Sequence, residues 1–511
     1  MSDGDLEATT STEPDPGSRW SRADWIAITL VVLLAGIIRL WGIASPHELI
    51  FDETYYAKDA CWYVNASESL CERAADAPEV HPPLGKWLIG IGIKLFGFDS
   101  FGWRISAAIA GILTVGLLYL LARRLFRSTL AATIASGLLA FDFLHFVQSR
   151  TSMLDIFLPL FGVAGFYFLV LDRDRMLSGD GGRGLLDRPW RLAAGASFGA
   201  AIATKWSGGL LLLGGLFLTI VWELAARKDR PVGERIRTGL RSETLSIALF
   251  MFVVPVLVYS LSYVGRVDGT WGLPWKEGTV TRNLWNHHDY MLDFHRNLES
   301  THSYQSPAWS WLLLKRPVSY YFCSDTTSPP CAPPAKAGDY GEVFATGNPF
   351  VWWTSLLALV FVAYQWIRKR DLRGPEGLIL AGFIFSFVPW LVLGRPAVFI
   401  FYLLPTVPFM CLALAYVATK IGRSWEATAA IALFSVATVG VFFFYLPLLT
   451  GRPIPQPEWN ARIWVFDHCD KPVGGPATAT MTETVRQQVT TRVIETTSDT
   501  SGLPPTGWCW I

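Results

Sequence analysis

The sequence predicts an all-α membrane protein that crosses the bilayer about eleven times. Three observations predict this class: 51% of the 511 residues are hydrophobic, only 17% are charged, and the mean hydropathy is +0.33. Soluble domains carry about 25% charged residues, so the missing charge sets this chain apart. The net charge of +1 provides no global basic field, and nucleic acid is therefore not an expected partner.

Apolar stretches near the roughly 20 residues that cross a bilayer recur along the chain. We place the spans at residues 25–44, 102–122, 130–148, 153–171, 191–204, 207–226, 244–264, 350–367, 377–393, 397–418 and 425–449. The chain then divides into a disordered tail (1–24), a transmembrane domain (25–449) and a C-terminal segment (450–511). Pro, Ser, Thr and acidic residues in the tail argue against a packed core there.

Orientation follows from the short loops, because Lys and Arg favour the cytoplasmic side. One set of loops is strongly basic: Arg123, Arg124, Arg127, Arg173, Arg175, Arg183, Arg188, Arg191, Arg227, Lys228, Arg230, Arg235, Arg237, Arg241, Arg368, Lys369, Arg370, Arg373, Lys420 and Arg423. The opposite short loops contribute only Arg150, Lys205 and Arg395. We therefore expect a plasma-membrane protein with a cytoplasmic N-terminus and an extracytoplasmic C-terminus.

Three segments lie outside the membrane on the extracytoplasmic side, namely 45–101, 265–349 and 450–511. Six of the seven cysteines fall in these segments, one pair in each: Cys61 and Cys71, Cys323 and Cys331, Cys469 and Cys509. Paired cysteines in an oxidising compartment suit three disulfides, although free thiols are the alternative. No P-loop, dinucleotide fingerprint or zinc spacing occurs, so we expect the chemistry on this outer face.

The first outer segment carries adjacent acids, Asp52 and Glu53, directly after the first span. Alone, the pair could be a solvated loop. Apolar residues at helical spacing over 84–98 predict an amphipathic helix at the interface, which would hold the acids at the level of lipid headgroups. A lipid-linked phosphate would lie at that depth.

Charged residues at the outer ends of spans are costly unless they are paired or functional. Arg104 and Asp155 open two spans, and we expect them to pair, either as a structural clamp or around a phosphate. Lys205 and Arg395 lie at other outer ends, so these groups could converge into a cationic pocket. His287, His288, His295 and His302 fit no zinc pattern, and no metal site is expected.

Several segments together resemble the protein O-mannosyltransferases of the C-type glycosyltransferase superfamily. The matching segments are 51–58 (FDETYYAK), 81–86 (HPPLGK), 103–107 (WRISA), 149–155 (SRTSMLD), 204–208 (TKWSG) and 394–395 (GR). The chain differs from eukaryotic members in two ways: 265–349 is too short for a β-trefoil domain, and Phe399-Ile400-Phe401-Tyr402 replaces a double histidine. A bacterial, actinobacterial-type member is therefore indicated.

The resemblance implies transfer of one mannose, with inversion, from polyprenyl-phosphate mannose to Ser or Thr hydroxyls of exported, unfolded proteins. Asp52 would be the general base, and Glu53 and Tyr56 would position the acceptor. Arg104, Lys205, Arg395 and Lys86 would bind the donor phosphate, with Asp155, His81 and His302 in support. No tightly bound cofactor is expected. A divalent-cation requirement stays open, and the Sec translocon is a candidate partner.

Two other functions compete with this interpretation. A transferase of the same fold could glycosylate a lipid or a cell-wall glycan through similar residues. A transporter or lipid-binding scaffold would need no catalysis, although transporters are often built from repeated halves and none is evident here.

Overall fold

The computed structural model describes residues 20–65, 67–72, 79–177, 187–264, 280–298, 302, 304–325, 327, 330–395, 397–421, 424–463, 478–485 and 488–495. Within these ranges, nine helical segments are long and apolar enough to cross a membrane. They are α1 (Arg22–Leu40), α5 (Ser100–Phe126), η2 with α8 (Leu154–Leu177), α10 (Gly208–Ala225), α11 through α12 (Val232–Leu261), α14 (Pro349–Lys369), α15 (Pro375–Val392), η6 with α16 (Ile400–Ala418) and α17 (Trp425–Thr450).

Two of the eleven expected spans contain no helix long enough to cross a membrane alone. The segment expected at 130–148 divides into α6 (Thr129–Ala140) and α7 (Phe143–Gln148), because Asp142 caps α7 with its side chain and interrupts the helix. The segment expected at 191–204 is α9 (Pro189–Thr204). At about 1.5 Å per residue neither α6 nor α9 alone reaches the roughly 30 Å of a bilayer core, so length does not confirm the count of eleven.

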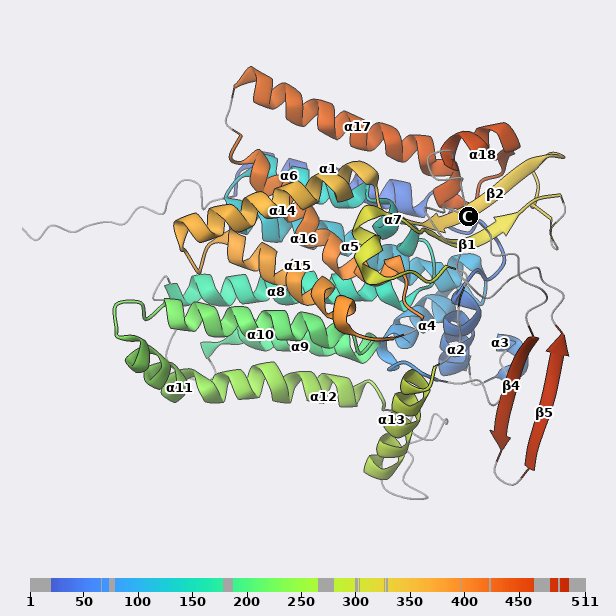
Figure 1. Cartoon of the computed structure of the whole chain (residues 1–511), viewed down its shortest axis with the longest axis horizontal. Coiled ribbons are helices and arrows are strands. Elements are labelled where there is room, and N and C mark those ends of the chain that lie inside the picture. Colours follow the sequence, from blue (N-terminus) through green and yellow to red (C-terminus); the bar gives the residue numbers. More distant parts are fainter. Residues whose placement is uncertain are drawn as a thin grey trace, which may run out of the picture.

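The helices run side by side, and the remaining elements gather at one end of the bundle, on the right in Figure 1. The helices at this end are α2 (Glu53–Asn65), α3 (Glu68–Cys71), α4 (Leu84–Phe96), α13 (Val280–Arg296), η5 (Ala308–Leu313) and α18 (Gln456–Ile463). The helix α4 matches the expected amphipathic segment. Helix α11, with its basic residues, lies toward the opposite end, which we call the basic end.

A small antiparallel sheet adds strands that the sequence analysis did not predict. Its order is β1–β2–β3, and a separate hairpin pairs β4 with β5. The bounds are β1 (Val318–Cys323), β2 (Asp339–Ala345), β3 (Ile454–Pro455), β4 (Thr478–Val485) and β5 (Gln488–Glu495). The sheet joins the loop between α13 and α14 to the chain after α17, so it ties the two outer segments together.

Two disulfides lie in the segments 45–101 and 265–349. Cys61 in α2 bonds Cys71 in α3, and Cys323 at the end of β1 bonds Cys331. The third expected pair, Cys469 and Cys509, lies outside the described residues, as does the tail through residue 19. Cys411, which the sequence places in a span, is a buried free thiol in α16. The first disulfide therefore joins α2, which begins directly after Asp52, to α3, and the second closes a loop after β1.

Candidate active site

The acids Asp52 and Glu53 lie where the chain enters α2. Phe51, directly before them, has φ of +48°, a left-handed conformation that costs a non-glycine residue about 1–2 kcal/mol. Its ring stacks on Tyr320 of β1, with centroids 4.5 Å apart, and meets the ring of Phe401 at 5.9 Å. Aromatic packing thus holds a tight turn, after which the two acids have entirely different surroundings.

Glu53 is fully buried and forms a two-point ion pair with Arg104 of α5. Arg104 donates from Nε to Oε1 and from Nη2 to Oε2, both at 2.8 Å. Its other N–H groups donate to the backbone carbonyls of Ile43, Pro46 and Glu48. The carboxylate also accepts from the backbone N–H groups of Ile50 and Ser152. This pair fastens the loop after α1 to α5, and Glu53 has no exposed surface for an acceptor.

The expected pair between Arg104 and Asp155 is wrong, because Asp155 contacts Lys205 instead. Lys205, just after α9, donates from Nζ to Oδ1 at 2.9 Å and to Oδ2 at 3.0 Å. The same ammonium lies 4.6 Å from the ring centroid of Tyr402, within cation–π range. The turn at Phe51 places Glu53 beside Arg104. Arg104 and Glu53 therefore pair with each other, and neither needs Asp155 as a partner.

Asp52 faces this second pair. Burial raises the pKa of Asp52 to about 6, with Lys205 opposing the rise, Asp155 adding to it, and a hydrogen bond with Tyr56 lowering it. The side chain nevertheless keeps partial access to solvent. A carboxyl group with a pKa near 6 is largely ionised at neutral pH and is basic enough to accept a proton. Its surroundings are those that tune general bases in active sites.

Arg395 lies between α15 and η6. His295 and His81 connect it to Tyr56 beside Asp52. His295 of α13 donates from Nε2 to the carbonyl of Val80 at 2.9 Å, so its Nδ1 is free to accept from Arg395 Nη2 at 3.3 Å. The His295 ring lies 5.4 Å from that of His81, which lies 5.9 Å from Tyr56. Among the described residues, Arg395 Nε is buried without a hydrogen-bond partner. A buried guanidinium donor with no partner is suited to an anionic ligand.

Two other predicted site residues, Lys86 and His302, form their contacts with residues other than Asp52. Lys86 is buried and pairs with Asp59 at 2.7 Å, so it stabilises the contact between α4 and α2. His302 is half-buried, its Nδ1 accepts from the backbone N–H of Tyr304, and its ring packs edge-on against Phe399 at 5.2 Å. Neither side chain forms a hydrogen bond or ion pair with Asp52 in the described part of the chain.

Sequence reasoning missed several residues that shape the site. Tyr402 flanks Lys205, and Tyr320 supports Phe51 while it accepts a hydrogen bond from Gln148 at 2.7 Å. His295 was noted only as a possible metal ligand. No pattern marked these residues, because their neighbours come from distant elements. Among the residues that the structure describes, no group of three His, Cys, Asp or Glu could hold a metal ion.

Sequence comparison identifies relatives along most of the chain. Residues 29–103 and 99–265 match the family described as "Dolichyl-phosphate-mannose-protein mannosyltransferase", and residues 280–467 match the "C-terminal four TMM region of protein-O-mannosyltransferase". A polyprenol-phosphate-mannose–protein mannosyltransferase of Mycolicibacterium smegmatis is 32% identical, over 88% of this chain and 94% of that protein. The protein of the same name in Mycobacterium tuberculosis is 30% identical, over 86% and 91%.

Solved structures share the fold. The protein O-mannosyltransferase Pmt1–Pmt2 complex of Saccharomyces cerevisiae, bound to its sugar donor, aligns with a TM-score of 0.70 at 15% identity, over 87% of this chain and 92% of the matched chain. ArnT of Cupriavidus metallidurans aligns with a TM-score of 0.51 at 17% identity, over 83% and 64%. Together with the family matches and the relatives that are 30% identical or more, these findings lead to one conclusion: the chain belongs to the dolichyl-phosphate-mannose–protein mannosyltransferase family of membrane glycosyltransferases.

Proposed function

We propose that this chain transfers mannose from polyprenyl-phosphate mannose to Ser or Thr hydroxyls of exported proteins, on the extracytoplasmic face of the plasma membrane. The observation that carries the proposal is the placement of Asp52, a partly exposed carboxylate with a pKa near 6 beside the Lys205–Asp155 pair. The basic loops lie at the opposite end of the bundle, which supports the orientation. The donor and the acceptor class are those in the names of the relatives and of the family.

The proposed reaction is a direct displacement at the anomeric carbon. Asp52 accepts the proton of the acceptor hydroxyl while the hydroxyl oxygen forms a bond to that carbon. The bond between the carbon and the phosphate oxygen breaks, and its electron pair leaves with polyprenyl phosphate. Attack opposite to the leaving group inverts the configuration of the sugar. No nucleotide is needed for this step.

Arg395 is the best candidate for holding the leaving phosphate. Its Nε has no hydrogen-bond partner among the described residues, and its contact with His295 is to a ring nitrogen that accepts. Burial and the neighbouring Arg395 lower the pKa of His295, so the ring is uncharged at neutral pH and leaves the guanidinium its full positive charge. Lys205 contributes less net charge, because Asp155 neutralises it.

The roles of four predicted residues change accordingly. Arg104, Glu53 and Lys86 hold the scaffold around the site, since their polar groups are occupied. Tyr56 is buried and hydrogen-bonds Asp52, so we propose that it orients the base rather than the acceptor. His81 lies between Tyr56 and His295, and links the base to the arginine side of the site. Delivery of unfolded acceptors by the Sec translocon is compatible with a site on this face.

A transfer assay tests the proposal. Purified full-length protein is incubated with labelled polyprenyl-phosphate mannose and a peptide that contains Ser and Thr, and mannosylated peptide is detected by mass spectrometry. We expect mannose on the Ser and Thr residues of the peptide. This transfer should be lost in Asp52→Asn and retained in Asp289→Asn, which changes an exposed acid on α13. Transfer to a lipid or glycan acceptor without peptide modification would contradict the protein acceptor. Failure to consume any donor would contradict the transferase itself.

A further inference from the structure

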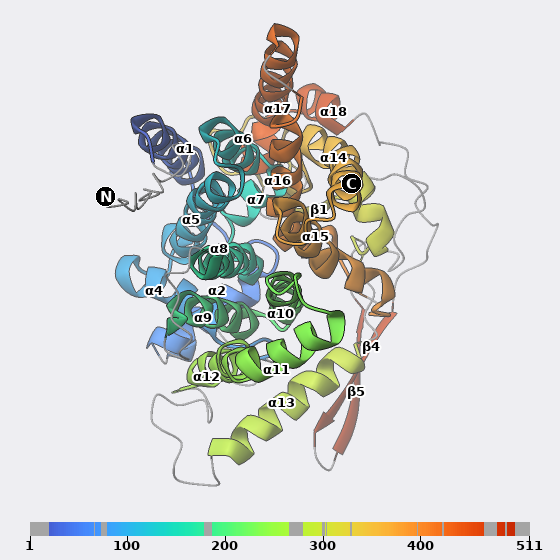
Figure 2. The same cartoon turned by 90° about the vertical axis from the view of Figure 1, so that its left-hand side faces the viewer.

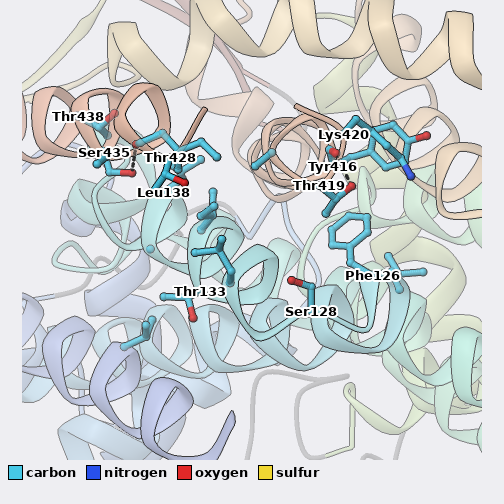
Figure 3. A pocket seen from close by; sticks show the side chains of 18 of the residues that line it. Phe126, Ser128, Thr133, Leu138, Tyr416, Thr419, Lys420, Thr428, Ser435 and Thr438 are labelled. Carbon is cyan, nitrogen blue, oxygen red and sulfur yellow. Dashed lines mark hydrogen bonds between the residues drawn. The ribbon is translucent and has the colours of Figure 1, made fainter. Parts of the chain in front are cut away.

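A cavity whose lining does not include Asp52 lies in the basic half of the bundle. It has a volume of about 1270 Å³ and lies between α1, α6, α16 and α17, because α17 stands away from the neighbouring helices at the edge of the bundle (Figure 2). Figure 3 shows its lining. Tyr416, Thr419 and Lys420, at the end of α16, face Ser128 and Thr133 at the start of α6. Ser435 and Thr438 of α17 line the opposite part of the cavity. We call this cavity the α6–α17 groove.

The groove has a cationic end. Arg127, Lys369 and Lys420 line it, and none of the lining residues is acidic. Lys369 donates to Glu376 and to the Tyr416 hydroxyl, whereas Lys420 is exposed, lies 5.3 Å from the Tyr416 ring centroid, and makes no ion pair in the described part of the chain. Helix α6 begins here, with Ser128 as its cap, and adds the positive end of a helix dipole. This end is therefore suited to an anion.

The rest of the groove is suited to hydrocarbon. Apolar side chains such as Val31, Leu34, Ile134 and Leu138 line it. The hydroxyls along its wall need no partner, because each donates to the backbone of its own helix: Thr133 to Thr129, Thr428 to Ser424, Ser435 to Ile431 and Thr438 to Phe434. From Thr428 to Val439 the wall extends about 16 Å, roughly one leaflet of the bilayer core.

A second cavity continues the groove to the other side of α17. It has a volume of about 380 Å³, lies between α14, α16 and α17, and is lined mainly by apolar residues such as Leu357, Phe361 and Phe434. Four residues line both cavities, namely Ile134, Ala418, Ile431 and Ser435. The hydrocarbon region therefore has two branches that meet beside the cationic end.

We propose that the α6–α17 groove binds one two-chain phospholipid with an anionic headgroup. The headgroup phosphate contacts Lys420 and Arg127, one acyl chain lies along α6 and α17, and the other enters the second cavity. A single-chain polyprenyl phosphate would fill only one branch. A helix from a second copy of the chain would leave the cationic end without compensating charge.

Lipid binding to the purified full-length protein tests this proposal. Dioleoyl phosphatidylglycerol and dioleoyl phosphatidylcholine are titrated separately, and bound lipid is counted by native mass spectrometry. We expect one phosphatidylglycerol per chain, bound more tightly than phosphatidylcholine. In Lys420→Gln the affinity falls about fivefold, the factor that matches about 1 kcal/mol per basic residue near a headgroup. The control, Lys228→Gln, removes an exposed lysine near the same end, outside the groove, and leaves the affinity unchanged.

A second variant fills the apolar part of the α6–α17 groove without changing its charge. Gly137 lines the groove, and a side chain added there meets nothing within 4 Å, so Gly137→Phe fills the groove while the helix persists. Gly440 on α17 is equally open but lies outside the lining, so Gly440→Phe is the matched control. We expect loss of the bound lipid only in Gly137→Phe. Equal binding of the two lipids, displacement of phosphatidylglycerol by an equimolar polyprenyl phosphate, or a dimer in place of the lipid would each overturn the proposal.

Discussion

Glu53 and Arg104 form a two-point ion pair, 2.8 Å at each contact, in which neither side chain has any exposure to solvent. Asp52, one residue earlier, is partly exposed and faces Lys205 and Asp155. Two adjacent acids therefore have different surroundings: Glu53 fastens the loop to the bundle, whereas Asp52 is the residue that we propose as the base. Both acids follow the turn at Phe51.

The first prediction concerns the buried pair. Arg104→Lys keeps the charge but loses the planar fork that contacts both carboxylate oxygens and three carbonyls. Each buried acceptor left without a donor costs about 1–3 kcal/mol, so we expect low abundance and a depressed melting temperature in detergent. Protein that survives should have an unchanged KM for the donor. Normal stability together with a raised donor KM would show that Arg104 binds the phosphate after all.

The second prediction concerns Arg395. Arg395→Gln removes the guanidinium that we assign to the leaving phosphate, and the loss of a charge-assisted contact in a preorganised site costs about 10²–10³-fold in rate. We expect kcat/KM for the donor to fall by about that factor with little change in melting temperature. Arg296→Gln, an exposed arginine on α13, is the control. Equal activities of the two variants would exclude Arg395 from donor binding.

The third prediction concerns pH. The folded-state pKa of Asp52 is about 6, above its ordinary value of 3.8. Activity should therefore fall as the pH drops below about 6, because the base becomes protonated. The contribution of Asp52 to the free energy of unfolding should change in the opposite direction. Between pH 3.8 and 6 the folded state binds a proton that the unfolded state does not. The stabilising contribution of Asp52 is therefore full below pH 3.8 and is lost as the pH rises through 6. Rates and melting temperatures between pH 4.5 and 8 check both trends, and a flat rate profile for the native protein would oppose them.

The fourth prediction concerns the disulfide between Cys61 and Cys71, which closes a short loop beside the site. Removing it with the pair of serine substitutions should destabilise the protein by about 2–3 kcal/mol, since loop closure restricts the unfolded chain. Peptide mapping without reductant should recover Cys61 joined to Cys71 and Cys323 joined to Cys331. Free alkylation of these four cysteines in the native protein would contradict the pairing and the oxidising location.

The sequence predicted the class of fold, because the length and hydropathy of apolar segments are enough to identify membrane spans. It did not predict where α6 ends, because the side chain of Asp142, besides capping α7, accepts hydrogen bonds from Asn348 and Trp352, which are more than 200 residues away. It also did not predict the small sheet, whose third strand, β3, lies more than a hundred residues after β2. Hydropathy carries no information on either feature.

The site was predicted in part for similar reasons. Motifs located Asp52, Lys205, Asp155 and Arg395, but they could not decide which acid pairs with which base. That choice depends on the left-handed turn at Phe51, and the ring of Tyr320, from a strand far along the chain, holds that turn. Pairing of buried charges is a property of three-dimensional packing, and linear spacing cannot reveal it.

The most direct measurement is single-turnover mannose transfer by Asp52→Asn, which keeps the size of the side chain and removes its basicity. General-base catalysis contributes about 10²–10⁴-fold, so the account predicts a loss of that size. We also expect unchanged donor binding and, at pH 7, a melting temperature no lower than that of the native protein, because the folded state disfavours the charged form of Asp52 and asparagine is neutral. Transfer at the native rate by stable, donor-bound Asp52→Asn would contradict the assignment of Asp52 as the base.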